Sequence, residues 1–370
     1  MTAPANSANS ATLSNFAMSE NFATPADPAM RADSALFEMS VISANSAIPA
    51  IPAIARVLVP IDFSETAAGA ARYADALAQR VGARVTLLHV VPPLSFDYAM
   101  AEPTESRAQE MRQDRLGAAE QALAAFPGAF SGASSGGSAP SPANEPIRAV
   151  VEGDAADQIL AHANDADLIV MPTRGRSALQ RWLTIGSVTQ RILHDAECPV
   201  LAGVDFSHAD VPRLDQFLAD RSSTAQPRRA AAPPNVSAGE ILCAVDLGEK
   251  THPVLAWGAG LSRALGARLS IVHAMPHFGE VTGDVVDPGW RPTLQSRLRD
   301  RVATAAAAAG AEGEVIVEPG EPHTVVAETA SRLGARLVII GRGVSHDLIG
   351  RLRAHAFEII RQSPCPVVSL

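Results

Sequence analysis

Aromatic residues, lysine and cysteine are all scarce in this chain of 370 residues. Phe, Trp and Tyr together make up 4% of it, and lysine occurs once, at Lys250. The three cysteines, Cys198, Cys243 and Cys365, have no C-x-x-C spacing, so they predict neither a disulfide framework nor a zinc site. We expect them to act as small buried hydrophobic residues in a reducing compartment.

Long hydrophobic runs and basic blocks are also absent from the sequence. No run has the length needed to cross a membrane, and the first 30 residues lack the basic and apolar parts of a secretory signal. With a formal net charge of −9 and no cluster of Lys or Arg, the chain does not fit a nucleic-acid-binding protein. We therefore predict a cytoplasmic protein that binds neither membrane nor nucleic acid.

The hydrophobic content of 47% is sufficient for well-packed cores. The chain also contains one stretch of sequence twice in similar form. Residues 56–93, beginning "RVLVPIDFSETA", match residues 240–276, beginning "EILCAVDLGEKT". Asp62 pairs with Asp246 and His89 with His273 at an offset of 184 positions, whereas Cys198 pairs with Cys365 at an offset of 167. A match of this length predicts a tandem domain duplication.

The change of offset places an insertion of 17 residues in the first copy. The Gly/Ser/Pro-rich segment 128–144 is the natural candidate, because no packed element tolerates that composition. The predicted organisation is then a disordered tail over 1–53, a first domain over 54–205, a linker over 206–238 and a second domain over 239–370.

Each copy alternates short apolar strands with helices. In the first copy we predict strands at 57–61, 85–91, 147–152, 168–171 and 200–204, and helices from Ser64 to Gly82 and over 107–126, 154–163 and 188–194. Strands that alternate with helices form a doubly wound parallel sheet. The predicted fold class is α/β, with two tandem five-stranded parallel-sheet domains of Rossmann-like architecture.

The motifs "VPIDFSETA" (59–67), "LLHVV" (87–91) and "GSVTQRILHDAECPVL" (186–201) resemble those of the universal stress protein family. The likeness covers about 145 residues of each copy, as in tandem bacterial members. It implies a fold related to the adenine nucleotide alpha hydrolases and a role in the stress response. It also implies ATP, with Mg²⁺, as ligand.

In the nucleotide-binding branch of that family the signature is G-x2-G-x9-G-[ST]. Its glycines let the backbone approach the ligand, and its last two residues open a helix whose free N–H groups receive phosphate oxygens. An acidic residue at the end of the first strand lies near the ribose and adenine. Carried over to this sequence, the resemblance implies a nucleotide site in the first copy made of Asp62, Val90, Thr173, Arg174, Gly175, Gly186, Ser187 and Val188.

The first copy departs from the signature twice. Pro172 stands where the first glycine is expected, and ten residues rather than nine separate Gly175 from Gly186. The second copy departs further, since Arg353 and Ala354 stand where the first copy has Gly186 and Ser187. We therefore expect no nucleotide in the second copy.

Structural explanations compete for several of these residues. Ser187 with Gln190 matches a capping box, the glycines serve turns, and Asp62 is placed to start a helix. His89 and His273 lie in apolar strands, where a backbone hydrogen bond explains a histidine better than catalysis does.

No nucleophile–base set, metal cluster or carboxylate pair recurs in both copies, so enzymatic activity beyond slow ATP hydrolysis has no basis in the sequence. The last strand of each copy, 199–202 and 366–369, is expected at a sheet edge. The resemblance implies that the two copies pair there as an internal pseudo-dimer and that chains pair as homodimers, and the open row of donors and acceptors at an unpaired edge gives the physical reason. A nucleotide-free scaffold for unknown protein partners is the alternative function.

Overall fold

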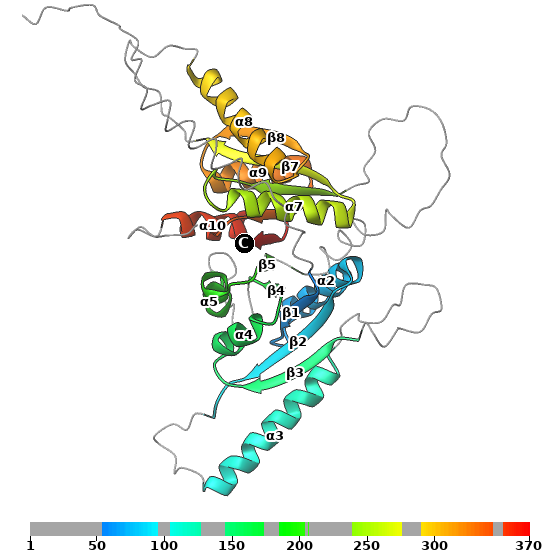
Figure 1. The fold of residues 1–370 in the computed structure, drawn as a ribbon. Coiled ribbons are helices and arrows are strands. Elements are labelled where there is room, and N and C mark those ends of the chain that lie inside the picture. The colour runs from blue at the N-terminus through cyan, green and yellow to red at the C-terminus, as the bar shows by residue number, and fades with distance from the viewer. Residues whose placement is uncertain are drawn as a thin grey trace, which may run out of the picture. The chain divides into compact units, whose positions relative to one another are not determined.

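The computed structural model describes residues 54–94, 104–126, 145–173, 185–203, 206, 239–275, 290–342 and 351–370 (Figure 1). The predicted tail, the predicted insertion at 128–144, and all of the predicted linker except Phe206 lie outside these residues. Phe206 is buried against helix α2, where its ring lies 5.4 Å from that of Tyr73.

The first copy contains five strands and four helices in alternation among its described residues. Its strands are β1 (Arg56–Pro60), β2 (Arg84–Val91), β3 (Ile147–Glu152), β4 (Leu168–Pro172) and β5 (Val200–Gly203). Its helices are α2 (Glu65–Val81), α3 (Glu105–Ala124), α4 (Ala155–Ala163) and α5 (Ser187–Asp195). Each element lies within a few residues of its predicted position, which confirms the predicted α/β alternation.

The second copy repeats the same order. Its strands are β6 (Glu240–Ala244), β7 (Arg268–Met275), β8 (Glu314–Pro319), β9 (Ala335–Ile340) and β10 (Val367–Ser369). Its helices are α7 (Thr251–Leu265), α8 (Trp290–Ala308), α9 (Pro322–Leu333) and α10 (Arg351–Gln362).

Each copy forms a five-stranded parallel sheet, in the orders β3-β2-β1-β4-β5 and β8-β7-β6-β9-β10. Strand order reverses next to β1 and β6, where β4 and β9 lie on the opposite side from β2 and β7. In open α/β sheets the crevice at such a reversal, outside the carboxyl ends of the strands, is where ligands bind.

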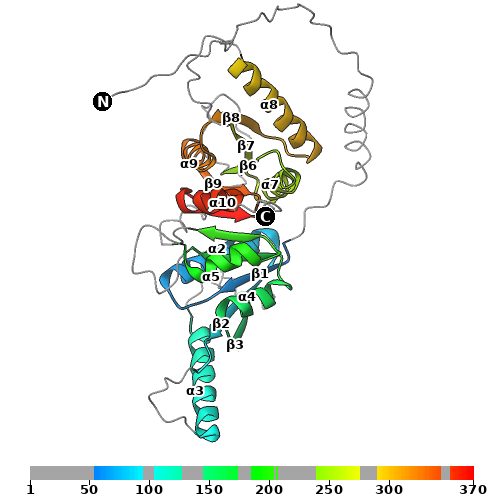
Figure 2. The same cartoon turned by 90° about the vertical axis from the view of Figure 1, so that its left-hand side faces the viewer.

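Helices cover both faces of each sheet (Figure 2). Side chains alternate along the strands, so that Val57 and Val59 pack in the core with α2 and α7, and Leu58 packs in the core with α4, α5 and α9. This alternation buries both faces of every central strand and explains their continuous apolar sequences.

The caps of α2 explain its limits. The Ser64 hydroxyl accepts a hydrogen bond from the Ala67 N–H at 3.1 Å, and Gly82 ends the helix in the left-handed conformation at φ 74°. Both were predicted from residue type, because a short hydroxyl side chain and a residue without Cβ suit these two positions.

The last strands of the two copies pair with each other. Strand β10 runs antiparallel to β5, with Val367 opposite Ala202 and Ser369 opposite Val200. The ten strands therefore form one sheet, and the predicted internal pairing of the copies is confirmed.

Candidate functional site

A cavity of about 270 Å³ lies in the first copy at the carboxyl ends of its central strands. Strands β1, β2 and β4 contribute one wall, and the starts of α4 and α5 contribute the other. Its lining is largely apolar, including Leu88, Ile159 and Met171, with a few polar groups around it. The volume lies close to the lower limit of roughly 300 Å³ for ligand pockets.

Asp62 lines this cavity just beyond the end of β1. Its Oδ1 accepts hydrogen bonds from the Ser64 N–H at 3.0 Å and from the Ser64 hydroxyl at 2.5 Å. The carboxylate therefore starts helix α2, as the structural explanation predicted, and also faces the cavity.

The backbone next to Asp62 is strained. Phe63 has φ 61°, a conformation that is rare for a bulky residue, and Leu247 repeats it in the second copy at φ 62°. The Phe63 ring packs against His89 with centroids 4.3 Å apart. Such conformations cost about 1–3 kcal/mol and concentrate at functional sites.

His89 is held by the backbone, as the sequence predicted. Its Nδ1–H donates to the Ile61 carbonyl at 2.7 Å, and His273 donates in the same way to Val245 at 2.8 Å. A carbonyl only accepts, so both rings carry a hydrogen on Nδ1. His89 lines the cavity, a position that the sequence analysis had not assigned to the site.

Helix α5 begins at the cavity with Gly186 as its N-cap and Ser187 as its first residue. The predicted capping box is therefore wrong. It requires Ser187 at the N-cap and Gln190 at the third helical position, but the third helical position is held by Thr189. The Gly186 N–H donates to the Thr173 carbonyl at 2.8 Å. The N–H groups of the first helical turn have no partner within a helix, which suits an anionic ligand.

Thr189 connects the start of α5 to the end of β4. Its hydroxyl donates to the Pro172 carbonyl at 3.1 Å, and the residue is only 4% exposed. Together with the Gly186–Thr173 bond, this contact fixes the helix N-terminus relative to the strand that lines the cavity.

Five of the eight predicted site residues line the cavity: Asp62, Val90, Gly186, Ser187 and Val188. Thr173 lies beside it, 2% exposed, and its hydroxyl makes no hydrogen bond among the described residues. Arg174 and Gly175 fall outside the described part of the chain. The arrangement thus brings together the residues of the predicted site that the structure describes.

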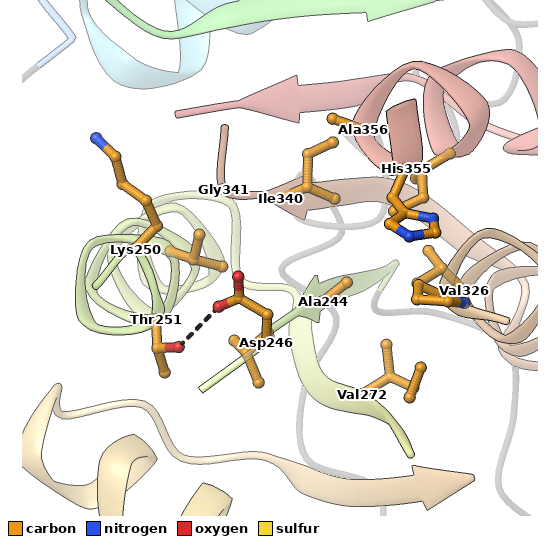
Figure 3. A pocket seen from close by; sticks show the side chains of 15 residues that line it. Ala244, Asp246, Lys250, Thr251, Val272, Val326, Ile340, Gly341, His355 and Ala356 are labelled. Carbon is orange, nitrogen blue, oxygen red and sulfur yellow. Dashed lines mark hydrogen bonds between the residues drawn. The ribbon is translucent and has the colours of Figure 1, made fainter. Parts of the chain in front are cut away.

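Figure 3 shows the corresponding cavity of the second copy and the side chains that line it. Its volume is about 110 Å³, well below that of the first. Lys250 and Gly341 line it, and a Cβ on Gly341 would come within 2.6 Å of the Lys250 Cβ. Asp246 repeats the role of Asp62 by accepting a hydrogen bond from the Gly248 N–H at 2.8 Å. The helix-starting function is therefore kept in a cavity with less room for a ligand.

Three side chains that the sequence analysis did not single out meet beside this smaller cavity. Ligand atoms of Glu321, His323 and His355 all lie within 4.8 Å of one another. No short motif joins them, because 32 positions separate the two histidines. Comparing the copies at the offset of 167 would have found them, since Ala156 and Val188 stand at the histidine positions in the first copy.

Of the three cysteines, Cys243 is fully buried and burial raises its pKa strongly, as expected of a core residue. Cys198 and Cys365 are only half-buried, so the prediction holds for one of the three. None of the described helices has the length and apolar character needed to span a membrane.

Comparison with known proteins gives the same family for both copies. The model of the universal stress protein family matches residues 54–202 and 238–369. A universal stress protein encoded in the QAH/OAS sulfhydrylase 3′ region of Thermus aquaticus is 33% identical over 147 residues, 39% of this chain and 95% of that protein. Universal stress protein MJ0531 of Methanocaldococcus jannaschii is 30% identical over 146 residues, 40% of this chain and 79% of its own length.

Solved structures match over both copies at once. The crystal structure of a universal stress protein from Archaeoglobus fulgidus has a TM-score of 0.51 and 20% identity, and covers 85% of this chain and 95% of its own. A functionally unknown protein, PA1789 from Pseudomonas aeruginosa, has a TM-score of 0.50 and 20% identity, with 86% and 92% coverage. These two structures share the tandem fold with this chain.

Proposed function

The chain belongs to the universal stress protein family, and we propose that it is a stress-response protein whose first copy binds ATP and signals its occupancy to protein partners. The adenosine would occupy the cavity between β1, β2 and β4, with Asp62 and the backbone of Val90 beside it. The phosphates would lie at the start of α5, near Gly186, Ser187 and Val188. The residue roles come from the family signature, and the cavity geometry supports them.

The observation that carries this proposal concerns Gly186. Its φ of −59° suits any residue, and an added Cβ would meet nothing closer than 3.6 Å, so neither backbone nor packing requires glycine. What glycine provides is the absence of a side chain where the helix N-terminus meets the cavity. That is the property a phosphate-binding turn needs.

The residues present fit an adenine nucleotide chemically. Apolar side chains such as Leu88 and Met171 suit a base, and the Asp62 carboxylate is a hydrogen-bond acceptor suited to ribose hydroxyls. The N-terminal end of α5 carries positive partial charge that stabilises phosphate oxygens. When bound, the triphosphate would add negative charge that this helix end is arranged to receive.

Calorimetric titration of the full-length protein with MgATP tests the proposal. We expect binding to the native chain and at least a tenfold loss of affinity in Gly186→Arg, which copies Arg353 of the second copy. Gly117→Arg in α3 is the matched control, since nothing lies within 4 Å of an added Cβ there. It should bind like the native protein.

Thermal melting gives a second measurement. ATP at 100 times its Kd should stabilise the chain by roughly 2.7 kcal/mol, and the stabilisation should disappear in Gly186→Arg. An unchanged melting temperature at millimolar MgATP, with no nucleotide co-purifying, would instead support the nucleotide-free scaffold.

A further inference from the structure

The corner where the helix after the third strand meets the last helix differs between the copies. In the first copy Asp154 caps α4 by accepting hydrogen bonds from the N–H groups of Ala156 and Asp157, both at 3.0 Å. The same carboxylate pairs with Arg191 of α5 at 3.1 Å. A cap and an ion pair thus join α4 to α5.

Among its described residues, the second copy shows neither this cap nor this ion pair at the equivalent corner. At the offset of 167, Glu321 replaces Asp154 and Glu358 replaces Arg191, so the pair of opposite charges becomes two acids. Glu321 stands at the N-cap of α9 but makes no side-chain capping hydrogen bond. The Glu321 carboxylate therefore does not cap its helix as the Asp154 carboxylate does.

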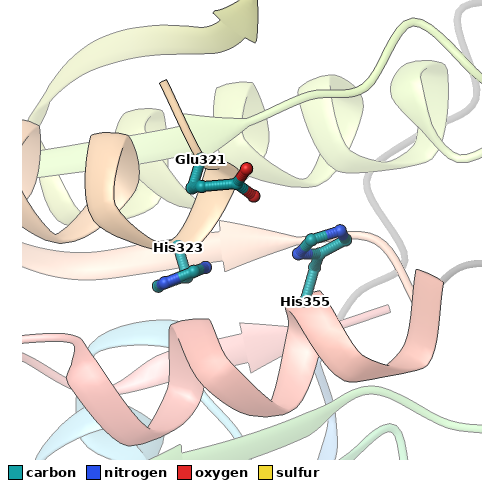
Figure 4. Close-up of side chains that lie close together, drawn as sticks. All are labelled: Glu321, His323 and His355. Atoms are coloured by element: carbon teal, nitrogen blue, oxygen red, sulfur yellow. The ribbon is translucent and has the colours of Figure 1, made fainter. Parts of the chain in front are cut away.

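Two histidines occupy the positions between these acids. His323 replaces Ala156 and His355 replaces Val188, so imidazoles stand where the first copy has apolar side chains. Figure 4 shows Glu321 and His323 at the start of α9 and His355 on α10, directed toward a common space. The two rings are nearly parallel, with an interplanar angle of 17° and centroids 6.4 Å apart.

One nitrogen in this group has no hydrogen-bond partner among the described residues. The Nδ1 atom of His323 is buried, and burying a polar atom without a partner costs free energy. Native proteins pair such atoms with protein, water or an ion. This buried atom without a partner, next to two further metal-ligating groups, points to a ligand at this corner.

We propose that Glu321, His323 and His355 bind a divalent transition-metal ion of the Zn²⁺ type. Imidazole and carboxylate are ligands that suit Zn²⁺, whereas Mg²⁺ and Ca²⁺ prefer oxygen alone. Ligands about 2.0–2.1 Å from one tetrahedral ion lie about 3.3 Å apart. The ligand atoms here lie within 4.8 Å, and the exposed side chain of Glu321 can rotate to close the difference.

The bound ion would join α9 to α10, as the Asp154–Arg191 pair joins α4 to α5. His355 also lines the cavity of about 110 Å³, so the ion would be reached from that cavity. The site requires no nucleotide in the first copy, and its test is independent of the ATP proposal.

The test is calorimetric titration of full-length, tag-free, chelator-treated protein with Zn²⁺ alone. The double variant His323→Ala/His355→Val copies the first copy, whose fold accommodates both residues, and it should lose one equivalent of Zn²⁺. Glu321→Gln should lower the affinity for that Zn²⁺ ion at least tenfold. His252→Ala, which removes an exposed histidine elsewhere in the second copy, is the matched control and should change nothing.

The cysteines contribute equally in all variants, so only the difference from the native chain counts. The proposal is overturned if the native chain binds no Zn²⁺ at tens of micromolar, or if the double variant binds the same number of ions with the same affinity. Circular dichroism checks folding. Should the double variant unfold, Glu321→Gln decides alone, because it changes only an exposed side chain.

Discussion

Asp75 is a carboxylic acid on the buried face of α2. The residue is 7% exposed, and its Oδ2 accepts one hydrogen bond from the Gln79 amide at 2.9 Å. Burial raises the pKa of Asp75 from 3.8 to about 6, and the Gln79 bond only partly opposes this. Between about pH 4 and pH 6 the folded chain therefore holds a proton on Asp75 that the unfolded chain has released.

This gives a prediction about the pH dependence of stability. Since the folded-state pKa is the higher one, the contribution of Asp75 is fully present below about pH 4 and is lost as pH rises to about 6. Asp75→Asn should remove that loss and raise the free energy of unfolding at pH 7.5 by about 1–3 kcal/mol. Urea titrations at pH 4 and pH 7.5 measure it.

The exposed Asp114 on α3 supplies the control for Asp75. Asp114→Asn should leave the difference between the two pH values unchanged. A lower stability of Asp75→Asn at pH 7.5 would show that the carboxylate is needed in its charged form.

Structural roles could be predicted from residue type wherever the role depends only on a residue and its neighbours in sequence. Ser64 and Gly82 were identified as helix caps because capping depends on the residue itself and its neighbours in sequence. Ser187 was assigned to a capping box wrongly, since the helix begins one residue earlier than the pattern suggested. The histidine pair escaped prediction because only tertiary folding brings His323 and His355 together.

At the scale of elements, one buried hydroxyl helps to fix the start of α5 on β4. Thr189 donates to the carbonyl of Pro172, the last residue of β4, and the second copy has Ala356 at the same place. The hydrogen bond is thus specific to the copy with the larger cavity. Its loss should leave the Gly186–Thr173 bond as the remaining hydrogen bond described between the helix N-terminus and the end of the strand.

Thr189→Val keeps the shape of the side chain and removes this donor. We expect the free energy of unfolding to fall by about 1 kcal/mol. Under the proposed function, affinity for MgATP should fall as well, because the first turn of α5 would be held less firmly at the cavity. Urea denaturation and calorimetric titration give the two values.

Thr304→Val is the matched control, because Thr304 makes a similar bond to the Asp300 carbonyl at 2.8 Å on an exposed face of α8. It should change stability by less than about 0.5 kcal/mol and leave nucleotide binding unaltered. Equal effects of the two substitutions would argue against a special role for the Thr189 contact.

Element order followed from the sequence because strands and helices carry different periods of apolar residues. Sequence also placed Asp62 at the carboxyl end of a strand and Gly186 at the start of a helix, and both residues line the cavity. It did not give the size of either cavity. The size of the second cavity depends on side chains such as Lys250, which lies against Gly341 although the two residues are far apart in sequence.

At the scale of the whole molecule, Arg342 connects the two copies. Its guanidinium donates to the carbonyls of Ala196 at 2.5 Å and Cys198 at 2.6 Å, beside the β5–β10 pairing. Burial lowers the pKa of Arg342. The guanidinium is thus used for a contact inside the chain.

Arg342→Ala should uncouple the copies. Two carbonyls would lose a charged donor, at a cost of about 2–4 kcal/mol, and unfolding should become less cooperative. Differential scanning calorimetry should show a broader or double transition, while Arg299→Ala on the exposed face of α8 should retain the native profile. A single sharp transition in Arg342→Ala would mean that the strand pairing suffices.

The pairing of β5 with β10 also has a consequence for synthesis. Val367 is added 164 residues after Gly203, so at roughly 5–20 residues per second the finished first copy waits about 8–33 s for its partner strand. During that interval β5 presents an open row of backbone donors and acceptors on the ribosome. Neighbouring nascent chains on one messenger would carry the same uncovered edge, which makes this interval the point in the life of the protein at which strand exchange between chains is most accessible.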